Sequence, residues 1–217
     1  MRSGMQPRSK SAADSTAKGQ IRQTNEALIL LAAEKVFARA GFGGATMAAI
    51  AEGSGLPKAN LHYYFGSKEV LYRAVLARIL NDWLVPAHGI SHDAEPRAAL
   101  ENYIRAKMAL SAQRPDASKV FANELLHGAP VVRTLLATEL RSLMQEKASV
   151  VQAWVDAGRM APVDAVHLFF TIWAATQTYA DFDVQVCAVL GKEALEPADY
   201  RRATEHVVSL LLRGCGL

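Results

Sequence analysis

The sequence predicts an all-α fold, and three observations support that prediction. Apolar residues recur at helical spacing in almost every segment after Asn25, and glycine or proline separates these segments. No stretch alternates apolar and polar residues between turn signals, and no internal repeat is present. With 217 residues, 51% of them hydrophobic and 21% charged, the chain can bury a substantial core.

The first expected helix covers "NEALILLAAEKVFARAGF", and Gly41 is placed to end it as a C-terminal cap. Thr46 stands at the N-cap position of a second helix, which Gly53 and Gly55 end within about two turns. The buried face of the first helix is expected to carry the apolar residues at helical spacing, which are Leu28, Leu31, Ala32, Val36 and Ala40.

A third helix begins after Leu56-Pro57, because proline loses no intrahelical hydrogen bond in the first turn. It runs through "KANLHYYF" and ends at Gly66. Leu61 and Phe65 are one helical turn apart, so we expect both side chains to pack inward against the first two helices.

Ser67 is placed to cap a fourth helix, "KEVLYRAVLARILNDWL", which Pro86 and Gly89 end. After a polar connector over His88–Pro96, the apolar spacing stays helical to the C-terminus. Further helices are expected over Ala98–Gln113, Ala117–Leu126, Val131–Gly158, Val163–Tyr179 and Asp199–Leu212. The Val131–Gly158 pattern is long enough to contain an interruption.

Three short helices with a tight turn between the second and third are the layout of a helix-turn-helix, so residues 23–72 are expected to form a DNA-binding domain. The second short helix of that motif offers its early residues to base edges in the major groove. Asparagine can read adenine and lysine can reach guanine or phosphate, while tyrosine and threonine hydroxyls suit phosphate. The expected DNA contacts are Thr46, Lys58, Ala59, Asn60, His62, Tyr63, Tyr64 and Lys68. The alternative is an ordinary solvated face of a small helical bundle.

The excess positive charge lies at the N-terminus, although the whole chain has a net charge of only +3. Residues 1–22 hold five basic residues against the single acidic residue Asp14, whereas residues 23–72 hold four of each sign. We expect residues 1–22 to be a flexible basic arm, which can add phosphate contacts beside a folded DNA-binding head. The alternative is a solvated tail with no such role.

The stretch Thr46–Lys68 resembles the amino-terminal motif of the TetR family of bacterial regulators, T-x-x-x-I-A-x-x-[AS]-G-[VL]-x-x-x-x-L-Y-x-Y-F-x-x-K-x-x-L. The matching positions are Thr46, Ile50, Ala51, Ser54, Gly55, Leu56, Leu61, Tyr64, Phe65, Lys68 and Leu71. Two positions depart from the family: Pro57 stands where a capping serine is common, and His62 replaces a common tyrosine. The resemblance implies a homodimer that binds a palindromic DNA operator and releases it when a small ligand occupies the carboxy-terminal domain, residues 73–217.

The resemblance continues over most of residues 24–190, where "ILNDWLVPA", "NELLHGAPVV" and "VVQAWVDAGRMAPVDAVHLFFTIWAATQTYADFDVQ" are similar to family members that regulate pyrimidine utilisation. It implies a uracil-like or thymine-like effector, or another planar heterocycle. Trp173, Gln177 and Asp181 share one helix face, where a tryptophan can stack on a flat ligand and a glutamine can pair with a cyclic amide. The expected ligand contacts are Trp83, Phe121, Glu124, Trp173, Gln177 and Asp181. The alternative is a core tryptophan beside one satisfied polar group.

The fourth helix carries Lys68 at one end and Trp83 at the other, so a ligand that contacts Trp83 can change the spacing of the two reading helices. The last two expected helices are apolar on more than one side and therefore need a second partner. The expected dimer-interface residues are Phe169, Phe170, Val207, Leu210 and Leu211. A packed core within one subunit gives the same pattern.

Other classes of protein fit the sequence less well. The chain has two cysteines, Cys187 and Cys215, without disulfide or zinc spacing, which favours a reducing cytoplasm. No apolar run approaches the roughly 18 residues of a membrane span. His88, His92 and Asp93 are a weak metal-site candidate because proline and glycine interrupt any helix there. No catalytic motif is present, so neither an enzyme nor a cofactor is expected. An architectural DNA-binding protein without ligand control is the remaining alternative, and the large apolar carboxy-terminal part argues against it.

Overall fold

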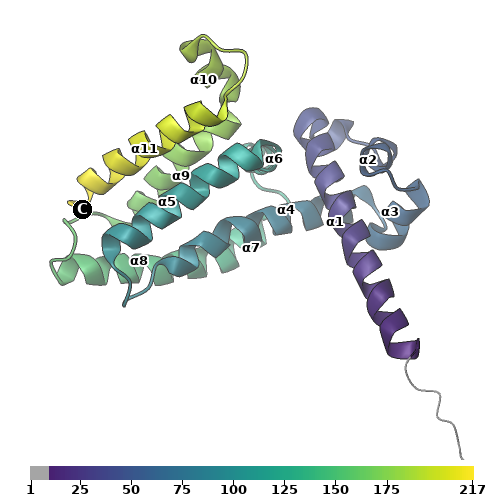
Figure 1. Ribbon diagram of the computed structural model, residues 1–217, viewed down its shortest axis with the longest axis horizontal. Coiled ribbons are helices and arrows are strands. Elements are labelled where there is room, and N and C mark those ends of the chain that lie inside the picture. The colour runs from purple at the N-terminus through teal and green to yellow at the C-terminus, as the bar shows by residue number, and fades with distance from the viewer. Residues whose placement is uncertain (1–9) are drawn as a thin grey trace, which may run out of the picture. The chain divides into compact units, whose positions relative to one another are not determined.

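The computed structural model describes residues 10–217, with side chains from residue 19 onward, and this part is helical without a strand. The all-α prediction is confirmed (Figure 1). The chain divides into two compact units, Met1–Ala74 and Val75–Leu217. Its helical elements are α1 (Lys10–Gly44), α2 (Met47–Ser54), α3 (Lys58–Phe65), α4 (Lys68–Leu84), η1 (Val85–Gly89), α5 (Pro96–Gln113), α6 (Pro115–Leu126), α7 (Arg133–Leu135), η2 (Leu136–Leu140), α8 (Arg141–Asp156), α9 (Ala165–Asp181), α10 (Asp183–Leu190) and α11 (Pro197–Gly214).

The helix ends of the amino-terminal unit lie where the local sequence places them. Gly41 interrupts α1 with a positive φ of 65°, a backbone conformation that side chains with a Cβ rarely adopt. The Thr46 hydroxyl oxygen caps α2 by accepting a hydrogen bond from the backbone N–H of Ala49 at 3.1 Å. Gly55 ends α2 in the left-handed conformation.

The helix α1 starts within residues 1–22, the segment that was expected to be a flexible arm. The helix begins at Lys10, so residues 10–22 are helical. The remaining part of the expected arm, residues 1–9, lies outside the described residues.

The buried face of α1 also differs from the predicted one. Of the predicted residues, Ala32 is buried, whereas Leu28 and Leu31 are exposed. The other buried residues of α1 include Ile29, Ala33 and Phe37. The sequence "ALILLAA" is apolar around the whole helix, so periodicity alone does not choose a face. Aromatic packing determines which face is buried, because the centre of the Phe37 ring lies 4.8 Å from the centre of the Tyr72 ring on α4.

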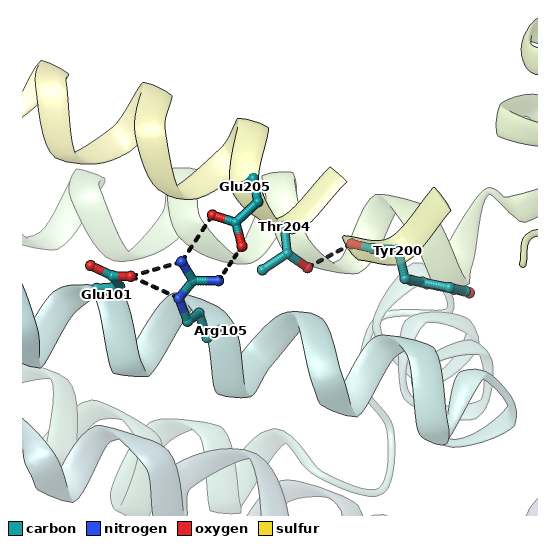
Figure 2. A network of polar contacts seen from close by, with 5 residues as sticks. All are labelled: Glu101, Arg105, Tyr200, Thr204 and Glu205. Atoms are coloured by element: carbon teal, nitrogen blue, oxygen red, sulfur yellow. Dashed lines mark hydrogen bonds and ion pairs between the residues drawn. The ribbon is translucent and has the colours of Figure 1, made fainter. Parts of the chain in front are cut away.

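The carboxy-terminal unit is built around α5, which packs against both α9 and α11 (Figure 1). The largest fully buried side chain is Trp154 of α8, and the Tyr103 ring of α5 meets the Phe169 ring of α9 edge-on at 5.9 Å. On the surface, Arg105 of α5 donates to Glu205 of α11 at 2.6 and 3.0 Å and to Glu101 at 2.8 Å (Figure 2). Exposed ion pairs contribute little stability, so the buried side chains hold these helices together.

The segment expected as one helix over Val131–Gly158 has three parts. It starts with α7, continues through the π-helical turn η2 and ends as α8. The length of this pattern indicated an interruption, and the π-helical turn at Leu136–Leu140 is one. The helix α10, which is short and largely apolar and which Gly191 ends in the left-handed conformation, was not predicted.

Candidate nucleic-acid interface and effector site

The exposed face of α3 carries four of the predicted DNA contacts. Lys58, Ala59, His62 and Tyr63 are exposed and form two pairs one helical turn apart, 58 with 62 and 59 with 63. Leu61, on the opposite face, is fully buried. The Tyr63 side chain is 77% exposed, and a large aromatic residue held at the surface of a short helix is available to a partner.

Other predicted contacts also serve the fold of the head. The Tyr64 hydroxyl accepts a hydrogen bond from Asn25 Nδ2 at 3.2 Å, which ties α3 to α1, and Asn60 is half-buried. His62 Nδ1 donates to the carbonyl of Gly66 at 2.9 Å, which ties the ring to the end of its own helix. The Thr46 oxygen accepts from its own helix, which leaves the hydroxyl hydrogen for another acceptor such as phosphate.

Lys68 is directed at the protein rather than outward. Its ammonium donates to the carbonyls of Phe42 at 2.7 Å and Ala45 at 3.0 Å, and it lies 4.5 Å from the centre of the Phe42 ring. These carbonyls lie at the C-terminal end of α1, where a positive charge is favourable. Lys68 therefore joins the end of α1 to the start of α4, and two of its three N–H groups are occupied.

In the carboxy-terminal unit, a buried cluster forms around Lys107 of α5. The Lys107 ammonium lies 4.5 Å from the centre of the Trp83 ring, which meets the Phe121 ring at 4.9 Å. Lys107 is only 4% exposed, and burial lowers the pKa of its ammonium to about 8, although the Asp181 charge opposes this change. Trp83 and Phe121 were predicted contacts, whereas sequence reasoning missed Lys107.

A sequence signal for Lys107 exists in retrospect. Tyr103, Lys107 and Ser111 follow one another at intervals of one turn, and all three are buried. A lysine between two residues of a buried row is unusual, since lysine is almost never fully buried without a partner.

Asp181 lies near the same cluster. The Ser118 hydroxyl of α6 donates to its carboxylate, and Lys119 pairs with Asp183, two residues further along the chain, at 2.7 Å. Burial raises the pKa of Asp181, while the bond from Ser118 and the charges of Lys107 and Lys119 act in the opposite direction. The carboxylate is therefore held on the side of α9 that faces α5 and α6.

Glu124, a predicted ligand contact, is engaged within the chain. One carboxylate oxygen accepts from the backbone N–H groups of Val131 at 2.6 Å and Val132 at 3.2 Å. The loop between Glu124 and Val131 contains Gly128 and Ala129, both with positive φ. Glu124 therefore stabilises a tight loop after α6, and we infer this structural role in place of a ligand contact.

Trp173 has surroundings different from those of Trp83. Its indole N–H donates to the Tyr103 hydroxyl at 2.8 Å, and burial raises the pKa of that hydroxyl to about 12. Trp173 also lines a cavity of about 300 Å³ together with Leu140 of the π-helical turn and Phe170. Gln177 is half-buried one turn from both Trp173 and Asp181. Apart from Glu124, the predicted contacts thus form a row along α9 and a cluster at Lys107.

Both units match known families. Residues 29–75 match the bacterial regulatory proteins of the tetR family, and residues 76–217 match the C-terminal region of YcdC-like proteins. The chain belongs to the TetR family. Its head is therefore the helix-turn-helix of a DNA-binding transcriptional regulator, and its relatives are regulators rather than enzymes.

Two curated relatives of this TetR-family protein carry functional names. The chain is 44% identical over 186 residues to the HTH-type transcriptional regulator RutR of Escherichia coli O157:H7, which covers 86% of this chain and 88% of that protein. It is 33% identical over 135 residues to the HTH-type transcriptional repressor NicS of Pseudomonas putida, which covers 60% of this chain and 61% of the repressor.

Two solved structures show the same fold at low identity. The ketosteroid transcriptional regulator KstR2 of Mycobacterium tuberculosis has a TM-score of 0.69 and 18% identity, covering 88% of this chain and 94% of that one. AibR, solved with isovaleryl coenzyme A and operator DNA, has a TM-score of 0.64 and 16% identity, covering 87% and 98%.

The residues expected at a dimer interface of this TetR-family protein fall into two groups. Phe169 and Val207 are buried within their own chain, so their apolar pattern reflects the core of one subunit. Phe170 and Leu210 are 48% and 62% exposed, and Leu211 is half-buried, so these three remain candidates for contact with a second subunit. Within the described residues, no helix is long and apolar enough to cross a membrane.

Proposed function

We propose that the protein is a homodimeric repressor that binds a palindromic operator and releases it when a uracil-like or thymine-like molecule occupies the carboxy-terminal unit. The observation that carries the proposal is the cluster of Trp83, Phe121, Lys107 and Asp181, which combines aromatic faces with one donor and one acceptor. The resemblance to pyrimidine-responsive members of the family supports the effector class. The protein acts in the cytoplasm, where bacterial DNA lies.

The cluster suits a flat polar ring. Aromatic side chains bind flat rings by stacking, and a few fixed polar groups orient a small ligand in an otherwise apolar site. Gln177, with its amide donor and acceptor, is half-buried one turn from Asp181 and can pair with a cyclic amide. Another planar heterocycle of the same size meets these requirements too.

The helix α4 supplies a physical link between ligand and DNA. It begins at Lys68, which bonds the end of α1, and it ends one residue after Trp83. A ligand can shift the equilibrium between the DNA-binding arrangement of the dimer and the released one only if it binds one of them better than the other. We infer that the effector fits the arrangement in which the two recognition helices of the dimer are not about 34–36 Å apart, the separation of successive major grooves.

The test begins with the full-length protein and a pool of random double-stranded DNA, from which bound sequences are selected at moderate salt. If the protein is a specific repressor, one palindrome should be enriched, and uracil or thymine should release the protein from it. Uniform loss of binding across all sequences as salt rises supports the architectural alternative. A selected palindrome that no pyrimidine releases contradicts the proposed effector but not the operator.

A further inference from the structure

Two lysines are buried in the carboxy-terminal unit among the described residues, and they differ in how their charge is satisfied. Lys147 of α8 is 4% exposed, and its ammonium donates to Glu146 at 2.7 Å. Lys107 is equally buried, and within the described part of the chain no oxygen accepts a hydrogen bond from its ammonium. Its contact is the face of Trp83, while Asp181 acts on it only through its charge.

A buried ammonium that bonds no acceptor is costly to the folded protein. The ring of Trp83 offsets part of this cost, but a ring face accepts none of the three N–H groups as an oxygen does. Such a group is most useful where a ligand supplies the missing acceptor, because the desolvation cost has already been met in the free protein.

The neighbours of Lys107 define the shape and chemistry of that ligand. Trp83 and Phe121 offer ring faces and edges, which suit a flat molecule. Asp181, which Ser118 bonds, is an acceptor on the other helix beside Lys107. A molecule with an oxygen for the ammonium and an N–H for the carboxylate satisfies both groups, and a cyclic amide or imide carries these two groups side by side.

We propose that Lys107 is the specificity-determining residue of the effector site, and that its ammonium donates to a ring carbonyl oxygen of a flat cyclic amide or imide lying against Trp83. The proposal rests on the proposed function for the identity of the effector site. Binding redirects the ammonium from the Trp83 face to the carbonyl oxygen. Trp83 is next to the last residue of α4, so this exchange occurs at the helix that connects to the DNA-binding head.

The test measures binding of uracil, 2-thiouracil and 4-thiouracil to the full-length protein by isothermal titration calorimetry. Sulfur is a weak acceptor, so the analogue whose sulfur replaces the recognised oxygen should bind about 10- to 100-fold more weakly than uracil. Lys107→Met should weaken uracil by a similar factor and should no longer distinguish uracil from that analogue. The matched control is Lys147→Met, which removes an equally buried ammonium elsewhere and should leave all three affinities unchanged.

Each contrary outcome has a separate meaning. Unchanged uracil affinity in Lys107→Met overturns the role of Lys107 and leaves the proposed function intact, because the wild type still binds its effector. Equal affinity of the wild type for all three compounds also overturns the role of Lys107. This comparison uses only the wild type, so it does not depend on whether Lys107→Met folds. If the wild type binds none of them, the effector class and the Lys107 assignment fall together.

Discussion

Replacing Lys107 by methionine should make the free protein more stable at neutral pH. Burial lowers the pKa of the Lys107 ammonium from 10.5 to about 8, which corresponds to about 3 kcal/mol against the charged form, at about 1.4 kcal/mol per pKa unit. The cation–π contact with Trp83, worth about 1–2 kcal/mol when desolvated, is lost in the variant. Methionine nearly matches the length of lysine, so we expect a net gain of about 1–2 kcal/mol.

The pH dependence of this gain follows from the direction of the pKa change. The folded state binds the Lys107 proton less tightly than the unfolded state, so the penalty is complete below pH 8. As the pH rises from about 8 to 10.5, the unfolded state holds more protons than the folded state, and the wild type gains stability. The advantage of Lys107→Met should therefore shrink across this range.

The assay is urea unfolding of wild type and variant at pH 7 and pH 9.5, at one protein concentration because dimerisation affects the result. Lys147→Met is the control, and it should be destabilised at both pH values because it loses the bond to Glu146. A Lys107→Met variant that is less stable than wild type at pH 7 refutes the reasoning. If Lys107→Met raises the free energy of unfolding equally at both pH values, the gain does not come from removing the buried charge of Lys107.

Three further substitutions separate folding from binding. Lys68→Met should lower the stability of the head by about 2 kcal/mol, measured by thermal unfolding, because the carbonyls of Phe42 and Ala45 lose their donor. Tyr63→Ala should weaken operator binding at least about tenfold by fluorescence anisotropy, while unfolding free energy changes by less than about 0.5 kcal/mol because the side chain is exposed. Glu124→Ala should cost about 1–3 kcal/mol of stability, and calorimetry should show unchanged uracil affinity. Unchanged stability in Lys68→Met or Glu124→Ala, or full operator affinity in Tyr63→Ala, contradicts the corresponding assignment.

Features that depend on neighbouring residues were predictable from the sequence. The all-α class, the interruption at Gly41, the Thr46 cap and the glycine that ends α2 each follow from a few adjacent positions. The exposed face of α3 was also predictable, because Leu61 fixes which side of so short a helix is buried.

Features that depend on distant contacts were not predictable. Lys68 bonds carbonyls more than twenty residues earlier in the chain, so its role within the head does not appear in the local pattern. The same holds for Glu124, whose carboxylate bonds a loop shaped by two positive-φ residues. Phe169 and Phe170 are adjacent and chemically identical, yet one is buried and the other is half-exposed, which only the packing of α9 against α5 decides.

The central claim is that the carboxy-terminal unit binds a pyrimidine-like effector, and ligand-dependent thermal unfolding tests it most directly. A ligand that binds only the folded state stabilises it by about 2.7 kcal/mol at one hundred times its Kd. We predict that uracil or thymine raises the unfolding midpoint of the wild type in a concentration-dependent way, and that Gln177→Ala reduces the effect. A midpoint that no pyrimidine moves at millimolar concentration contradicts the claim.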